Sequence, residues 1–357
     1  MRRASYEAQN DPYIGGETMV SNKKTLLFGC AMVLMIAFFI SGCAEKNDWK
    51  KAQQTNTVES YQSFLKSYPS GKYVTKAKSA IENFEWEKAN QSKLLGDYLN
   101  YLKKYPNGQF VAQAKAEADK QMVRKGKDNA LMVLIPEGEF EMGSDQGDDE
   151  KPVHKVFVKA FYIDLYEVTN AQYKKFVDEM NYKPIKHAND SKINMPDQPM
   201  VNVTWYDALE YCKWAGKRLP TEAEWEKASR GGLVGKLYPW GDTLFHDNAN
   251  YYGVRGKDFW DTSAKVGDFP PNRYGLYDIA GNAQEWCADW YDAKYYSVSP
   301  KDNPTGAKPG NEVVTRGGSW GDDITNSRES GLRVAKRRGL DPYDANPYTG
   351  FRCAMDK

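Results

Sequence analysis

A repeat of 37 residues is the feature that most restricts how the first third of this chain can fold. It covers residues 49–122, and the apolar residues of each copy fall at helical spacing before a Tyr-Pro-x-Gly turn that ends the helix. The matched positions are Trp49, Ala52, Tyr61, Phe64, Leu65, Tyr68, Pro69, Gly71, Tyr73 and Ala77 in the first copy and Trp86, Ala89, Tyr98, Tyr101, Leu102, Tyr105, Pro106, Gly108, Phe110 and Ala114 in the second. Each copy is therefore predicted to be a helical hairpin.

These hairpins resemble the tetratricopeptide-like repeats of envelope proteins. A single hairpin cannot bury its apolar face, and two copies are few for a repeat array. Two roles stay open for this all-α module: a spacer that holds the following domain away from a membrane, or a docking surface for a partner. A polar linker is expected over residues 123–130.

A continuous apolar stretch, Leu26 to Ile40, follows the basic pair Lys23-Lys24. Its length of about 15 residues suits the core of a signal peptide and is short for a membrane-spanning helix. Together with Ile40, the segment Ser41-Gly42-Cys43 resembles the lipobox of bacterial lipoproteins, in which the Cys thiol receives a diacylglycerol and cleavage makes that Cys the new N-terminus. The alternatives are an ordinary signal peptide or a short anchor helix.

Cys43 is therefore the expected lipid attachment site, with residues 19–42 as the signal peptide and residues 43–48 as a tether. The residue after Cys43 is not an aspartate, which favours the outer membrane of the cell envelope over the inner membrane. Acidic residues are unusual ahead of a signal peptide. Since residues 1–18 carry three of them, translation is expected to start at Met19 and this extension to be non-native.

The charge balance excludes one class of partner. Lys and Arg number 49 against 48 Asp and Glu, and a nucleic-acid surface needs a basic excess. No nucleic-acid partner is expected. The expected partners are the bacterial membrane, through lipidated Cys43, and an unidentified envelope protein, peptide or glycan.

Residues 131–357 are predicted to form one α+β domain with little regular secondary structure. Strands are expected over Val133–Ile135 and Val156–Ile163. After residue 230 the chain is mostly Gly, Pro, Asn, Asp and aromatic residues, and such long irregular segments need to be held by a metal, a disulfide or a functional site. Three helices are predicted from capping boxes, in which a Thr and the residue three positions later satisfy free backbone groups. They begin at Thr169, Thr204 and Thr221.

Seven motifs follow one another along this domain. They are Ile135–Gly143, Phe161–Asn170, Trp214–Trp225, Pro239–Gly241, Gly275–Trp286, Arg316–Trp320 and Gly350–Cys353. In this order they resemble the sulfatase-modifying factor, or formylglycine-generating enzyme, family. The resemblance implies a variant of the C-type-lectin-like fold over nearly all of residues 130–357.

The resemblance also implies which residues formylglycine-generating activity would require. The family's enzyme oxidises a sulfatase Cys to formylglycine with O₂, copper and two cysteines placed a few residues beyond a Gly-Gly-Ser motif, and Cu(I) prefers thiolates. No Cys occurs between Cys287 and Cys353, so neither copper nor formylglycine-generating activity is expected. Asp322, Asp323 and Ser327 lie in this stretch and are weak acid–base candidates, because solvated loop carboxylates are more common than catalytic ones.

Structural calcium is the cofactor that the resemblance implies, at two sites. Irregular loops can supply the several oxygens that Ca²⁺ requires through carboxylates, amides and backbone carbonyls. The alternative is a set of turn-forming Asn and Asp residues without metal. The first site would use the side chains of Asn250 and Asp258 with the carbonyls of Tyr251 and Trp260. The second would use the side chains of Asp278 and Glu285 with the carbonyls of Gly281 and Ala283.

The resemblance further implies a disulfide between Cys212 and Cys353, which an exported domain can keep. The alternative is two buried thiols, and Cys287 is expected to be a buried thiol in either case. Two functions stay open: a non-catalytic binding or scaffold module, and an enzyme of different chemistry. Convergent perturbed carboxylates or a metal near Asp322 would favour the enzyme, whereas an open cleft lined by aromatic residues would favour binding.

Overall fold

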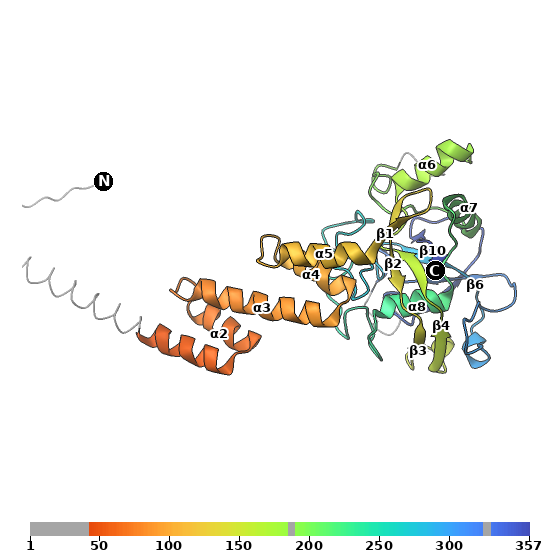
Figure 1. The fold of residues 1–357 in the computed structure, drawn as a ribbon. Helices are drawn as coiled ribbons and strands as arrows, with labels where there is room; N and C mark the ends of the chain where they lie inside the picture. The colour runs from red at the N-terminus through yellow and green to blue at the C-terminus, as the bar shows by residue number, and fades with distance from the viewer. Residues whose placement is uncertain (1–42, 185–189, 324–329) are drawn as a thin grey trace, which may run out of the picture. The chain divides into compact units, whose positions relative to one another are not determined.

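The computed structural model describes residues 43–184, 190–323 and 330–357 (Figure 1). The chain divides into two compact units, one ending at Phe84 and the other running from Glu85 to Lys357. None of the helices described is long and apolar enough to cross a membrane. The predicted signal peptide and Ser327 lie outside the described residues.

The first unit is helical around one tryptophan. It contains a helix over residues 43–55, α2 (Val58–Ser67) and the first part of α3 (Val74–Ser92). The buried Trp49 stacks on Tyr73, with ring centroids 5.3 Å apart, and meets the edge of a second ring from α2. The repeated apolar positions of the first copy therefore form its core.

The second copy of the repeat builds the same aromatic core. It supplies α4 (Leu95–Lys104) and α5 (Val111–Gln121). Trp86 stacks on Phe110 with ring centroids 5.1 Å apart, which matches the Trp49 stack at the 37-residue offset. The helices expected for both copies are thus present, and the likeness to tetratricopeptide-like repeats stays a prediction.

The second copy packs directly on the C-terminal domain. The Gly96 amide donates to the Arg273 carbonyl at 3.0 Å, and the Asn100 side-chain amide donates to the Pro271 carbonyl at 3.3 Å. Leu95, at the start of α4, is almost completely buried. The division between the units therefore falls inside the predicted repeat module rather than at its end near residue 122.

Gly96→Val is expected to weaken this packing. A Cβ at Gly96 would overlap the Asn272 carbonyl oxygen, which is backbone and cannot rotate away. Overpacking of this kind lowers the free energy of unfolding by about 1–3 kcal/mol. Thermal unfolding followed by circular dichroism measures the change. Gly310→Val, at an exposed position with open space around it, is the control, and equal melting temperatures for the two variants would contradict the packing.

The segment predicted as a linker, residues 123–130, is instead a β-hairpin. Strand β1 (Met122–Lys125) directly follows α5 and pairs antiparallel with β2 (Ala130–Ile135) (Figure 1). Gly126 and Asn129 both have positive φ, which permits the tight connection. Polar composition indicated a linker, but the pairing of β1 with β2 makes this segment the edge of a sheet.

The described residues of the domain form three small sheets. The predicted strand over Val156–Ile163 is two strands in different sheets, because the chain bends at Lys159, whose amide donates to the Asn303 side chain at 2.8 Å. The first sheet has the order β1-β2-β5-β10, with β5 at Phe161–Asp164 and β10 at Ala354–Asp356. The second pairs β3 (Gly138–Met142) with β4 (His154–Val158). The third has the order β8-β7-β6-β9, at Arg337–Leu340, Val313–Arg316, Gln284–Trp290 and Thr349–Gly350.

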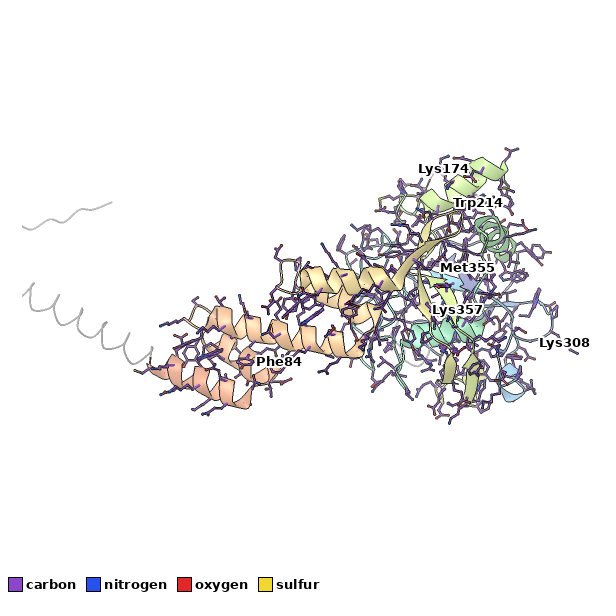
Figure 2. All side chains as sticks on the ribbon, in the orientation of Figure 1. Phe84, Lys174, Trp214, Lys308, Met355 and Lys357 are labelled. Carbon is purple, nitrogen blue, oxygen red and sulfur yellow. The ribbon has the colours of Figure 1, made fainter. Side chains whose placement is uncertain are left out.

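All three predicted capping boxes are confirmed. They begin α6 (Asn170–Met180), α7 (Trp205–Ala215) and α8 (Glu222–Arg230). Lys174 and Trp214, labelled in Figure 2, belong to α6 and α7, which pack together through aromatic rings. Two short 3₁₀ helices, Asp148–Glu150 and Tyr295–Ser297, complete the described elements.

Helix α8 is buried along its whole length although five of its nine residues are charged. Its carboxylates pair with arginines of the third sheet: Glu226 lies 2.5 Å from Arg316, and Glu222 lies 2.7 Å from Arg337. These buried ion pairs hold β7 and β8 against the helix. They place the loop that follows β7, which carries the Gly-Gly-Ser motif.

Candidate functional site

The loop after β7 holds Asp322 in a closed turn. The Asp322 carboxylate accepts the Ser319 amide at 2.7 Å and is paired with the Arg338 guanidinium. Only 8% of Asp322 is exposed. The Asp322 side chain therefore accepts hydrogen bonds that hold the turn, and the Arg338 guanidinium balances its charge. Of the other two acid–base candidates, Asp323 is exposed, and Ser327 lies outside the described residues.

Three aromatic residues lie at this turn. The Tyr252 amide donates to the Asp322 carbonyl at 3.3 Å, and the Trp320 ring lies 4.7 Å from the Tyr348 ring. Tyr252 is 65% exposed and Tyr348 is 40% exposed. We call Tyr252, Trp320 and Tyr348 the aromatic surface. The aromatic richness beyond residue 230 hinted at it, but the chain segments that meet here are far apart in sequence.

The first predicted calcium site has a buried oxygen without a partner. The Asn250 side chain is almost completely buried, its nitrogen donates to the Thr262 carbonyl at 2.8 Å, and its Oδ1 has no hydrogen-bond partner among the described residues. The Asp258 carboxylate accepts the Tyr251 amide at 3.2 Å and contacts His246 at 3.1 Å. Burial raises the pKa of Asp258. A bound cation would satisfy the Asn250 oxygen. The residues present therefore fit a calcium ion.

The second predicted site repeats this pattern at Asp278. This residue has positive φ, and its Oδ2 accepts the Gly267 amide at 2.6 Å. Its Oδ1 is buried and, within the described chain, has no hydrogen-bond partner. Burial raises the pKa of Asp278 to about 7. An unpaired buried carboxylate is costly, and a cation would remove that cost.

Glu285 differs from its predicted role as a ligand of this second site. Its carboxylate accepts the Arg352 guanidinium at 2.7 Å and the Trp225 indole at 2.8 Å, and the side chain is fully buried. These hydrogen bonds occupy both oxygens of the Glu285 carboxylate and hold it in the core of the domain. Asp278 is therefore the side chain left to the second site, with the carbonyls of Gly281 and Ala283 as its predicted companions.

Glu167 belongs to this site, although the sequence did not single it out. Its carboxylate accepts the Asn282 side-chain nitrogen at 2.6 Å and the Ala283 amide at 2.8 Å. Burial, together with the charges of Asp278 and Glu285, raises the pKa of Glu167 well above its usual range. A signal was present, because Glu167 is a charged residue within the otherwise apolar run from Leu165 to Val168. A cation bound here would offset the cost of ionising this buried carboxyl group.

The predicted disulfide partners lie side by side. The sulfurs of Cys212 on α7 and Cys353 before β10 are 2.7 Å apart, both side chains are buried, and the structure has them as free thiols. Burial raises the pKa of both thiols. The disulfide bond between them stays a prediction. Cys287 is buried, as expected.

Histidine, cysteine and carboxylate side chains do not supply a metal site by themselves. Within residues 43–184, 190–323 and 330–357, no three of them are grouped so that they could hold an ion. The two predicted calcium sites depend instead on an amide, carboxylates and backbone carbonyls. The candidate site thus lies in the irregular loops of a C-type-lectin-like α+β domain. These loops bring buried oxygens close to the aromatic surface.

Residues 115–357 match the sulfatase-modifying factor enzyme 1-like domain. The chain belongs to this family, and the predicted family and fold class are confirmed. The match begins ahead of the predicted domain boundary at residue 131 and includes strand β1.

Three known proteins illustrate the relationship. The formylglycine-generating enzyme of Bos taurus is 37% identical over 281 residues, covering 63% of this chain and 74% of that protein. The serine/threonine-protein kinase pkn1 of Chlamydia pneumoniae is 38% identical over 260 residues, covering 67% of this chain, and the match spans only 40% of the kinase. The solved structure of PvdO from Pseudomonas aeruginosa is similar with a TM-score of 0.58 and 29% identity, covering 66% of this chain and 98% of PvdO.

Proposed function

We propose that this protein is a lipoprotein of the bacterial cell envelope that presents its formylglycine-generating-enzyme-like domain as a non-catalytic binding or scaffold module. The observation that carries the proposal is the turn at Asp322. In the stretch where the family's enzyme uses thiolates, this chain has a carboxylate that is occupied by Arg338 and the Ser319 amide. Hard oxygen groups of this kind cannot replace a Cu(I)–thiolate pair.

The surroundings of this turn favour binding over a different catalytic chemistry. The Arg338 guanidinium is paired with the Asp322 carboxylate and compensates its charge. Beside it lies the aromatic surface, and exposed aromatic rings are typical anchors for a bound partner. The proposed partner is a peptide, a glycan or another envelope protein, and crosslinking on the native membrane followed by mass spectrometry would identify it.

The proposal includes the anchor and the cofactor. Cys43 would carry the lipid, with the outer membrane as the favoured location. Calcium would be held by Asn250 and Asp258 at the first site and by Asp278 at the second, with nearby carbonyls completing each shell. There it would supply positive charge that fixes the irregular loops. No copper is expected.

The copper-loaded protein is expected to leave a Cys-containing sulfatase peptide unchanged, because the thiolate pair is replaced by Asp322 and Ser327. Mass spectrometry of the peptide after incubation with O₂ measures the conversion of Cys to formylglycine. The bovine formylglycine-generating enzyme under the same conditions is the positive control. Formation of formylglycine by this protein would overturn the non-catalytic assignment.

A further inference from the structure

One residue, Asn282, touches both proposed calcium sites. Its backbone amide donates to the Asn250 carbonyl at 2.9 Å, and the Asn250 side-chain nitrogen donates to the Asn282 Oδ1 at 3.3 Å. In the chain, Asn282 stands between Gly281 and Ala283, whose carbonyls belong to the second site. A ligand of the first site is therefore hydrogen-bonded to the residue that orients two ligands of the second.

Burial and several hydrogen bonds fix the conformation of Asn282. The residue is fully buried and has a positive φ of 61°. Its Oδ1 also accepts the Ala264 amide at 2.8 Å, and its side-chain nitrogen donates to Glu167 at 2.6 Å. The neighbouring Gly281 passes so close to the Asn250 carbonyl that a Cβ would overlap it. A shift of Asn250 would therefore be transmitted to the backbone that carries the second site.

The same residue reaches the aromatic surface. The Asn282 carbonyl accepts the Trp320 amide at 2.9 Å, and the Gly281 amide donates to the Gly317 carbonyl at 2.9 Å. These bonds join the turn between the two sites to the loop that carries Asp322. Calcium at the sites and order in that loop thus share one hydrogen-bond network.

We infer that Asn282 is a positioning residue that couples the two calcium sites, so that calcium at either site raises the affinity of the other and orders the loop at Trp320. This inference rests on the calcium sites of the proposed function. Coupling between two binding sites is reciprocal by thermodynamic necessity, and its usual size is about 5- to 150-fold in affinity. Reciprocity supplies a test that a merely structural residue would not pass.

Calorimetric titration of Ca²⁺ into the full chain is the experiment. Asp258→Ala disables the first site, and Asp278→Gly disables the second while allowing the positive φ at that position. Each is expected to weaken calcium binding at the remaining site by the same factor, about 10-fold. Asn282→Gly keeps the left-handed backbone and its backbone bonds but removes the side-chain bonds to Asn250, Ala264 and Glu167, and in that background the factor is expected to decrease.

Asn181→Gly is the matched control, because Asn181 is also left-handed but is exposed at the end of α6. Hydrogen exchange at the Trp320 amide is the second readout, and calcium is expected to slow it equally in the parent protein and in Asn181→Gly, and less in Asn282→Gly, which keeps the backbone acceptor but loses the side-chain bonds that position it. Two ions bound by the parent protein, with the remaining site of each single-site variant keeping its affinity, would overturn the coupling and leave the sites standing. A parent protein that binds no Ca²⁺ would overturn the sites and the coupling together. If Asn282→Gly does not fold, the reciprocity of Asp258→Ala and Asp278→Gly decides alone.

Discussion

Glu226→Gln is expected to destabilise the C-terminal domain by about 3–5 kcal/mol, because it removes one partner of a buried charge network. The Glu226 carboxylate is fully buried and pairs with Arg316 at 2.5 Å and Arg230 at 2.7 Å. It also accepts the Gly143 amide at 2.8 Å. Among the described residues, a neutral amide would leave the fully buried Arg316 with Glu222, at 3.3 Å, as its remaining carboxylate partner.

The titration of Glu226 has the same basis. Burial alone would raise its pKa, but Arg230 and Arg316 outweigh burial and hold the pKa of Glu226 below its usual range. A lowered pKa in the folded state means that the charged form contributes stability above the ordinary Glu pKa. That stability is lost as the pH falls through the lowered value. Glu226→Gln should therefore reduce the acid sensitivity of the domain as well as its stability at neutral pH.

Urea unfolding at neutral pH measures the stability change. Asp178→Asn is the control, because it breaks the exposed Lys174–Asp178 pair on α6 at 2.7 Å, and exposed pairs contribute about 0–1 kcal/mol. A loss for Glu226→Gln no larger than that of the control would show that the network around α8 does not hold the third sheet in place.

Cys43→Ser is expected to move the whole population of the protein from the membrane fraction to the soluble fraction. Membrane attachment in the proposed function depends on the diacylglycerol on this thiol, and each buried CH₂ of its chains contributes about 0.8 kcal/mol. Fractionation of cells that express the full chain, with the intact mass of each form, measures the effect. The intact mass of the uncleaved precursor also reports whether translation starts at Met19.

Ala44→Asp is the control for this prediction. It leaves the thiol in place, so the protein should stay in the membrane fraction and shift from the outer to the inner membrane of a Gram-negative host. Cys43→Ser protein that remains on membranes would refute lipidation as the anchor. It would favour the alternative of a short anchor helix.

Local patterns account for what could be predicted from the amino-acid sequence. The three capping boxes were correct because the bonds that begin α6, α7 and α8 join residues only three positions apart. The helices of the two copies were predicted from a period that each copy satisfies by itself, and the structure adds the stacks of Trp49 and Trp86. Motifs in the family's order identified the family for the same reason: each of them is short and continuous.

The site needed the tertiary structure, because its contacts join distant parts of the chain. Glu285 was predicted to bind calcium, and only the fold shows that Arg352 and Trp225 already use its carboxylate. The linker became strand β1 because β2 lies beside it to accept its hydrogen bonds. In the same way, Asn250 and Asn282 meet across 32 positions, a pairing that no local rule encodes. By itself, then, the sequence determined the family, the capped helices and the repeated aromatic cores, whose bonds are local. The tertiary structure decided which buried oxygens stay free for a cation, since that depends on which distant donors the folded chain brings to each carboxylate.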